Sequence, residues 1–211
     1  KQRMSSAASD GYKRQVLGML AGLPMAILIA RKTFGKWLSI ILDTLINIPI
    51  IVPSIALGIS LKFFWAGSGI TEFLLLVFAH LAITYPYFVR SMSAALERIP
   101  FDMEEASKTL GAKPLVVFRT IVWPLTKYSI ISGAIIVFTR SVSETGATLA
   151  VASHLQTAPV LIVTWVNSVR GTIPTIAGVD ALTVGLACGL LILFSVIILL
   201  VLRLLTRKGK I

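Results

Sequence analysis

Long apolar blocks, separated by short polar stretches, occupy most of this 211-residue chain. A helix needs roughly 20 apolar residues to cross a bilayer core about 30 Å thick. Five blocks approach or exceed that length: residues 11–30, 37–65, 73–88 continuing to 97, 128–138 continuing to 152, and 176–205. The pattern predicts an all-α integral membrane fold with about five transmembrane helices, in which residues 1–211 form a single transmembrane domain.

Two prolines, Pro49 and Pro53, interrupt the second block. Each removes a backbone hydrogen-bond donor, so we expect a bent helix. Carbonyl groups freed by such a bend are tolerated in lipid only where neighbouring protein or water satisfies them. Pro49 and Pro53 are therefore candidates for lining a translocation pathway, and a tolerated kink is the alternative.

The composition agrees with a membrane protein, since 56% of the residues are hydrophobic and 14% are charged, against about 45–50% and about 25% in soluble domains. The net charge of +11 does not indicate nucleic-acid binding, because the Lys and Arg residues lie at the ends of apolar blocks. Cys188, His80 and His154 are isolated in the sequence. Ordinary structural roles are expected for them, with no internal disulfide and no metal site.

Basic residues predict the orientation of the spans. They cluster after the first, third and fifth blocks: Arg31, Lys32 and Lys36; Arg98, Lys108, Lys113, Arg119 and Lys127; Arg203, Arg207, Lys208 and Lys210. With five spans these regions share one side, expected to be the cytoplasm, and loops near residues 67–71 and 154–175 lie on the other. The basic N-terminal tail would then break the rule. The chain starts at Lys1 without Met, so a missing leader or first helix is expected.

The stretch between the third and fourth blocks, residues 98–124, is unusually polar for the middle of this chain. Asp102 and Glu105 have the spacing of a capping box at the start of a short helix. Glu104 and Lys108 have the i, i+4 spacing of a favourable ion pair. Gly111 is expected in the left-handed conformation that ends such a helix.

A second short helix is predicted from Pro114, which suits a first helical turn. Leu115, Phe118 and Val122 share its apolar face, and Pro124 is expected to separate it from the next membrane helix. Two capped helices joined at a glycine favour a rigid docking element over a solvated connector.

This loop resembles the EAA signature of type I, binding-protein-dependent importer permeases of the ATP-binding-cassette (ABC) class. The signature reads E-A-A, three residues, G, nine residues, I-x-L-P, and the spacing here is complete. The matching positions are Glu105, Ala106, Ser107, Gly111, Ile121, Trp123 and Pro124, with Ser107 and Trp123 replacing the second Ala and the Leu. "LPMAILIARKTFGKW" and "NIPIIVPSIALGISL" are also similar to family segments. The family usually has one more helix ahead of the first block.

The resemblance implies a transport mechanism in a prokaryotic inner membrane. Two permease subunits, expected to be a homodimer, form one pathway, and residues 98–124 dock as a cytoplasmic coupling loop on an ABC ATPase dimer. An extracytoplasmic binding protein delivers the solute. ATP and Mg²⁺ are expected on the ATPase, because this chain has no G-x-x-x-x-G-K-[ST] phosphate loop. The chain is therefore expected to be a transport subunit without catalytic residues or cofactors.

The segment "FTRSVSETGATLAVAS", residues 138–153, bears on the solute. Arg140 and Glu144 are spaced i, i+4 near the end of a predicted span, where charges line a pathway or pair with one another; we expect pairing. The segment resembles the "RALGEFGATL" type of molybdate, tungstate and sulfate permeases. The matching positions are Arg140, Ser141, Glu144, Gly146, Ala147 and Thr148. Arg140, Glu144 and Gly146 join Pro49 and Pro53 as pathway candidates.

Three alternatives stay open at this point. The same segment is similar, less closely, to the "KELPATLLL" type of ferric-iron permeases, so iron or another small solute is a second possibility. A secondary transporter or channel is a different class, which the EAA spacing and the lack of internal inverted repeats argue against. A scaffold that only assembles a membrane complex is the third.

Overall fold

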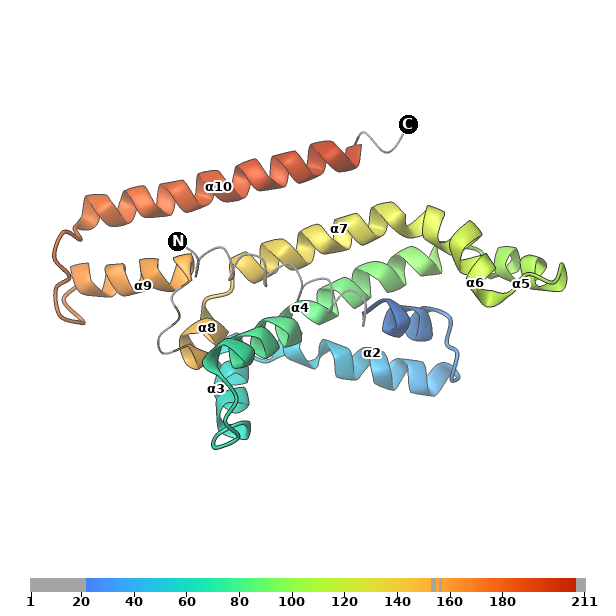
Figure 1. Cartoon of the computed structure of the whole chain (residues 1–211), viewed down its shortest axis with the longest axis horizontal. Coiled ribbons are helices and arrows are strands. Elements are labelled where there is room, and N and C mark those ends of the chain that lie inside the picture. Colours follow the sequence, from blue (N-terminus) through green and yellow to red (C-terminus); the bar gives the residue numbers. More distant parts are fainter. Residues whose placement is uncertain (1–21, 153–154, 156, 208–211) are drawn as a thin grey trace. The chain divides into compact units, whose positions relative to one another are not determined.

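The computed structural model describes residues 22–152, 155 and 157–207, and all regular structure in this part of the chain is helical (Figure 1). The chain divides into two compact units. Unit 1 comprises Lys1–Ile51 and Leu81–Phe138, and unit 2 comprises Val52–His80 and Thr139–Ile211. The single transmembrane domain predicted from the sequence stays a prediction.

Unit 1 is centred on three helices that pack closely. They are the helix of residues 22–30, the second half of α4 (Glu72–Glu97) and most of α7 (Trp123–Val142). The core around them consists of Ala26, Ile29, Phe88, Val89, Met92, Leu96 and Val137, together with Val122 immediately before α7. Gly22 and Gly133 both face the ring of Phe88. Small residues at such positions let membrane helices approach one another closely.

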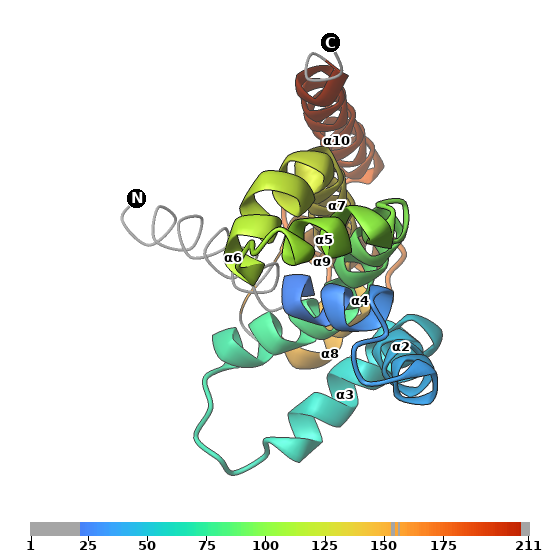
Figure 2. The same ribbon diagram turned by 90° about the vertical axis from the view of Figure 1, so that its right-hand side faces the viewer.

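The described residues of unit 1 include two further parts. In α2 (Lys36–Ile51), Asn47 accepts a hydrogen bond of 3.2 Å from Arg90 in α4, which joins the two helices. The segment between α4 and α7 forms α5 (Phe101–Thr109), α6 (Pro114–Val117) and the π-helical turn η1 (Phe118–Val122). Figure 2 looks along α4 and α7, with α5 and α6 at the near end.

Unit 2 contains two pairs of packed helices. The first is α3 (Ser54–Phe64) with α8 (Gly146–Val151), and the second is the antiparallel pair α9 (Ala158–Val169) and α10 (Ala181–Arg207) (Figure 1). A Cβ atom on Gly58 of α3 would lie 2.9 Å from the Cα atom of Ala147 in α8. The backbones of α3 and α8 therefore touch at a glycine.

The second predicted span is broken rather than only bent. It forms two helices, α2 and α3, which break at Val52 and Pro53. Pro53 has φ −54° and ψ 129°, outside the helical region, and a residue that precedes proline is disfavoured in helical conformation. Pro49, by contrast, lies inside α2.

The number of spans differs in part from the predicted five. Within the described residues, three helices are long and apolar enough to cross a membrane, or four if α2 and α3 form one broken span. Most of the first predicted block lies outside the described residues. The prediction that the fourth block continues as one helix to residue 152 was wrong, because α7 stops at Val142 and α8 is a separate helix. The loop predicted at residues 154–175 was also wrong, since it contains α9, an apolar helix too short to span alone.

The start of α10 is capped by Asp180. Its carboxylate accepts hydrogen bonds from the Thr183 backbone N–H, at 2.7 Å, and from the Thr183 hydroxyl, at 2.5 Å. These bonds stabilise the charged form and lower the pKa of Asp180.

Because its pKa is lower in the folded chain, Asp180 contributes stability above its unfolded-state pKa and loses it as the pH falls through the folded-state value. We expect faster amide hydrogen exchange at the first turn of α10 in Asp180→Ala at neutral pH, with the difference from the parent chain vanishing in acid. A pH-independent difference would contradict the capping role.

Candidate functional site

The first helix of the predicted coupling loop begins differently from the sequence prediction. Pro100 is the N-cap residue of α5, and no side chain caps this end. The capping box predicted for Asp102 and Glu105 was therefore wrong. The fixed φ angle of proline starts the helix two residues before Asp102, which leaves both carboxylates inside the helix.

The end of α5 confirms the prediction for Gly111. This residue has φ +82°, and its N–H donates to the Lys108 carbonyl oxygen at 2.9 Å, while the Ala112 N–H donates to the Ser107 carbonyl oxygen at 3.0 Å. This pair of bonds is a Schellman motif, which requires a left-handed residue. Nothing lies within 4 Å of a Cβ atom built on Gly111, so backbone conformation rather than space demands glycine here.

The second helix of the loop starts at Pro114, as predicted, but Pro124 does not separate it from the membrane helix. The chain passes from α6 through η1 directly into α7. In a π-helical turn the bonds run from residue i to i+5, and the Trp123 N–H donates to Phe118 in this way. We attribute the continuity to this turn, which accommodates a residue without an N–H.

The side chains predicted to form the apolar face of the second helix differ in their exposure. Val117 and Val122 are buried and Phe118 is half-buried, whereas Leu115 is exposed. Leu110 is the most exposed apolar side chain of the loop, at 88%.

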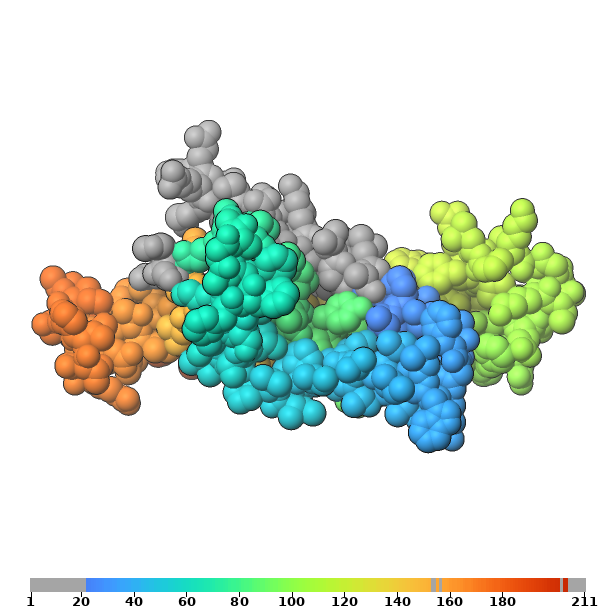
Figure 3. Space-filling view, turned by 90° about the horizontal axis from the view of Figure 1, so that it is seen from below, coloured from blue at the N-terminus to red at the C-terminus, as the bar shows by residue number. Residues whose placement is uncertain are grey.

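Most of the EAA-like positions lie on the loop surface. Glu105, Ala106, Gly111 and Pro124 are exposed, and Ser107 and Ile121 are half-buried. The exposed apolar side chains near them are Phe101, Met103, Leu110, Leu115 and Val116. In Figure 3 this yellow-green part of unit 1 has side chains that project into open space. The arrangement provides an apolar surface with a carboxylate at Glu105, as expected of a docking element.

Glu104 does not pair with Lys108, contrary to the sequence prediction. Its carboxylate accepts a hydrogen bond from Arg31, and both side chains are nearly buried. The ammonium group of Lys108 instead lies 5.7 Å from the centre of the Phe101 ring. A distant but buried partner has displaced the local i, i+4 pair.

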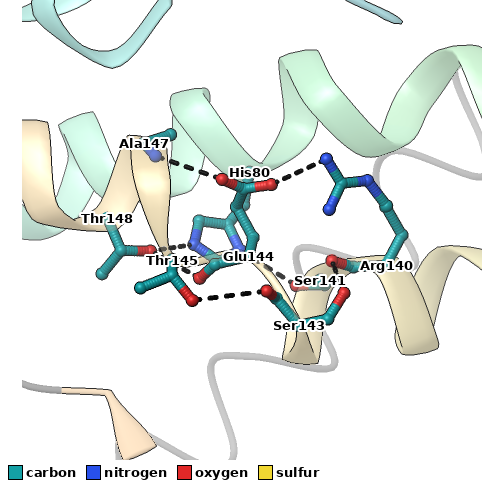
Figure 4. A network of polar contacts seen from close by, with 8 residues as sticks. All are labelled: His80, Arg140, Ser141, Ser143, Glu144, Thr145, Ala147 and Thr148. Carbon is teal, nitrogen blue, oxygen red and sulfur yellow. Dashed lines mark hydrogen bonds and ion pairs between the residues drawn. The ribbon is translucent and has the colours of Figure 1, made fainter. Parts of the chain in front are cut away.

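Unit 2 contains the second candidate site, where Arg140 and Glu144 form the predicted ion pair (Figure 4). A guanidinium N–H of Arg140 lies 3.0 Å from a Glu144 carboxylate oxygen; the Arg140 side chain is 35% exposed and that of Glu144 is 2% exposed. The other Glu144 oxygen accepts a bond of 3.1 Å from the Ala147 backbone N–H. One buried carboxylate thus connects the end of α7 to the start of α8.

His80 connects α4 to both sides of the same break (Figure 4). One ring nitrogen lies 3.0 Å from the Ser141 hydroxyl and the other lies 2.9 Å from the Thr148 hydroxyl. Thr148 donates its own proton to the Glu144 carbonyl oxygen at 3.2 Å, so it accepts from His80. The network therefore favours the tautomer with the proton on Nε2.

The structure places four of the five predicted pathway residues, Arg140, Glu144, Gly146 and Pro53, in unit 2. Gly146 follows Glu144 closely in the chain, and a Cβ atom there would lie 2.5 Å from the Ser54 hydroxyl of α3. Pro53 precedes Ser54 and so adjoins the same place in unit 2. Pro49 belongs to α2 in unit 1. That these residues line a pathway stays a prediction.

Sequence reasoning missed the polar partners that lie far away along the chain. The partners are His80 with Ser141 and Thr148, Arg31 with Glu104, and Arg90 with Asn47. A lone histidine in an apolar block gives no signal of its partners. Arg90 did offer one, because an arginine within a predicted span needs a polar neighbour.

Comparisons with known proteins identify the family. Residues 22–209 match the family described as binding-protein-dependent transport system inner membrane component. The molybdate/tungstate transport system permease protein WtpB of Pyrococcus abyssi is 30% identical over 198 residues, which cover 92% of this chain and 74% of that protein. WtpB of Pyrococcus furiosus is 34% identical over 154 residues, 72% of this chain and 61% of that protein. The molybdenum transport system permease protein ModB of Escherichia coli K12 is 32% identical over 166 residues, 66% and 68% of the two chains.

A solved structure has the same fold. A chain of the MetNI methionine ABC transporter, in inward facing conformations, superposes with a TM-score of 0.75 at 19% identity and covers 95% of this chain and 91% of its own. At that identity the similarity shows the fold alone. The match across residues 22–209 and the relative that is 30% identical over 92% of the chain establish the family: this multi-pass chain belongs to the inner membrane permeases of binding-protein-dependent ABC importers.

Proposed function

We propose that the chain is the permease subunit of an ATP-driven importer of tetrahedral oxyanions, with molybdate and tungstate as its solutes. The observation that carries this proposal is the likeness, at 30% to 34% identity, to permeases named for molybdate and tungstate transport. The residues that carry the resemblance to oxyanion permeases lie together around the α7–α8 break: Arg140, Ser141, Glu144, Gly146, Ala147 and Thr148. Ferric iron and sulfate are the solutes against which molybdate and tungstate are to be compared.

The partners in this proposal follow from the same family. An ABC ATPase dimer carries ATP and Mg²⁺ and binds the exposed surface of α5 and α6. A second permease subunit, which we take to be another copy of this chain, completes the pathway. An extracytoplasmic binding protein delivers the oxyanion. The Schellman motif at Gly111 supports the docking role, because it fixes the angle between two short helices that expose apolar side chains.

The test of the solute uses the chain purified with its ATPase and binding protein in proteoliposomes. Uptake of molybdate and tungstate that requires ATP, measured by elemental analysis of the vesicles, is the expected result. Sulfate and ferric iron are the comparison solutes. Uptake of iron without molybdate would overturn the oxyanion assignment, and failure to recover any ATPase with the chain would overturn the coupling role.

The coupling role predicts a strong effect of Gly111→Val. A β-branched residue at φ +82° is strained by about 1–2 kcal/mol, and relief of that strain changes the angle between α5 and α6. We expect the variant to insert in the membrane and to lose at least about tenfold in ATP-driven uptake. Glu105→Lys, which reverses the exposed carboxylate of the docking surface, is expected to act in the same way.

Gly67→Val is the matched control for Gly111→Val. Gly67 has φ +78°, nothing lies within 4 Å of a Cβ atom built on it, and it belongs to the turn between α3 and α4. The two variants carry similar backbone strain at different places, so comparable losses of uptake would show that strain alone is responsible. Gly111→Asn, which tolerates the left-handed conformation, is expected to retain most of the activity.

A further inference from the structure

Arg31, which is not part of the coupling loop (residues 98–124), makes several contacts with it. Its guanidinium donates to the carboxylate of Glu104 in α5 and to the carbonyl oxygen of Ile99, 3.3 Å away, in the link between α4 and α5. The same group lies 5.9 Å from the centre of the Phe101 ring. The side chains of Arg31 and Glu104 are 12% and 11% exposed. One residue at the end of the 22–30 helix thus contacts three groups at and just before the beginning of α5.

The packing between the helix of residues 22–30 and the coupling loop leaves an open space beside this ion pair. An open cavity of about 260 Å³ is lined by Arg31, Glu104 and the apolar side chains of Ile27, Leu96, Val117 and Val122, among others. Protein interiors are normally close-packed and therefore resist rotation of one element against another. A multiply bonded ion pair beside a cavity instead fixes one point and leaves room for movement around it.

The two adjacent glutamates at the EAA-like segment, Glu104 and Glu105, differ in burial. Glu105, which matches the signature, is exposed on the loop surface. Glu104 is turned inward and bonded to Arg31. Neighbouring residues on a helix point about 100° apart, which allows one to meet a partner protein while the other holds the loop.

We propose that the Arg31–Glu104 pair is the fixed point about which the coupling loop turns, and through which its motion reaches the helix of residues 22–30. The proposal rests on the proposed function, in which α5 and α6 dock on an ATPase. Arg31 and Glu104 are positioning residues: they contact neither solute nor nucleotide, and they determine how much uptake each hydrolysed ATP produces.

Arginine is suited to this role in a way that lysine is not. The planar guanidinium donates to Glu104 and to the Ile99 carbonyl oxygen in fixed directions, and it lies over the Phe101 ring. A lysine ammonium group keeps the charge but cannot reproduce this geometry. Arg31→Lys is therefore a conservative variant that separates geometry from charge.

The test measures molybdate uptake per ATP hydrolysed by the full permease–ATPase–binding-protein complex in proteoliposomes. Arg31→Glu and Glu104→Arg are each expected to lower this ratio about tenfold, because each leaves two like charges facing one another, and the ATPase should still co-purify. The exchanged pair, Arg31→Glu with Glu104→Arg, is expected to recover to within about threefold of the parent. Arg31→Lys should fall between the parent and the single reversals.

Lys36→Glu is the matched control. It makes the same change of charge at an exposed residue five positions later, and it is expected to leave the ratio unchanged. A parental ratio in the single reversals, loss of the ATPase from the complex, or no recovery in the exchanged pair would each overturn the proposal. If a charge-reversal variant fails to accumulate in the membrane, Arg31→Lys becomes the deciding variant. A parental ratio of uptake to ATP hydrolysis in Arg31→Lys would then overturn the proposal. Absence of ATPase with the parent chain would be a different result, against the proposed function itself.

Discussion

Gly58→Ala is expected to destabilise the chain although it adds a single methyl group. The new Cβ atom would lie 2.9 Å from the Cα and carbonyl oxygen atoms of Ala147 and 2.9 Å from the Cβ atom of Ala150. None of these three atoms belongs to a flexible side chain that could move aside. Relief therefore requires α3 and α8 to separate, and overpacking of this kind costs about 1–3 kcal/mol.

Separation of α3 from α8 has a second consequence. The N–H of Ala147 is the backbone donor to the buried Glu144 carboxylate, so movement of α8 weakens the polar network at the α7–α8 break. We expect Gly58→Ala to lower both the thermal unfolding midpoint of the purified chain in detergent and its uptake activity. Gly58→Leu should have the same effects more strongly.

Gly189→Ala provides the control for this prediction. Gly189 lies inside α10, and nothing comes within 4 Å of a Cβ atom built there. Alanine is preferred over glycine within a helix by about 0.5–1 kcal/mol, so this variant should be neutral or slightly stabilising. Equal unfolding midpoints for Gly58→Ala and Gly189→Ala would show that the close contact between α3 and α8 does not exist.

The parts of the fold that were predictable depend on local chemistry. Gly111 and Pro114 determine a helix end and a helix start within a few residues of themselves, whatever the rest of the chain does, and the structure has both. The break at Pro53 is equally local, because proline restricts both itself and Val52. The pairing of Arg140 with Glu144 needs only one helical turn.

The failures arise where a distant residue competes with a local one. Lys108 has the favourable spacing from Glu104, but Arg31, 73 residues away, provides a buried and more fully bonded partner. A buried charge gains more from a pair than an exposed one does, so tertiary packing decides. The continuity of the helix through Pro124 depends on a π-helical turn, and local spacing gives no sign of it.

The Arg140–Glu144 pair is expected to show strong coupling in a double-substitution cycle. Arg140→Ala removes the guanidinium from the Glu144 carboxylate, whose side chain is 2% exposed, and leaves the Ala147 N–H bonded to it. Breaking a buried pair in this way costs about 3–5 kcal/mol, and the 35% exposure of Arg140 places the expected loss at the lower end. Glu144→Ala should cost less, since the long Arg140 side chain can extend to a hydrated region.

The combined variant should be less damaged than the sum of the two single variants, by about 1–3 kcal/mol in unfolding free energy. Glu144→Gln separates the two functions of this carboxylate, because it retains an oxygen for the Ala147 N–H and loses the charge. Arg170→Ala removes an exposed cation at the end of α9 and should leave stability unchanged. Simple additivity of Arg140→Ala and Glu144→Ala would exclude the pair as a stabilising unit.

The same variants distinguish pairing from direct contact between Arg140 and an oxyanion. If pairing is the main role, Glu144→Ala partly restores the uptake lost in Arg140→Ala, because the unpaired buried charge is gone. If Arg140 binds the oxyanion, uptake stays low in the combined variant, and ATP hydrolysis in the absence of solute is retained. We expect the first outcome, because a cation already neutralised by Glu144 holds an oxyanion weakly enough for release, whereas an unpaired arginine in a poorly hydrated place would bind it too tightly for rapid turnover.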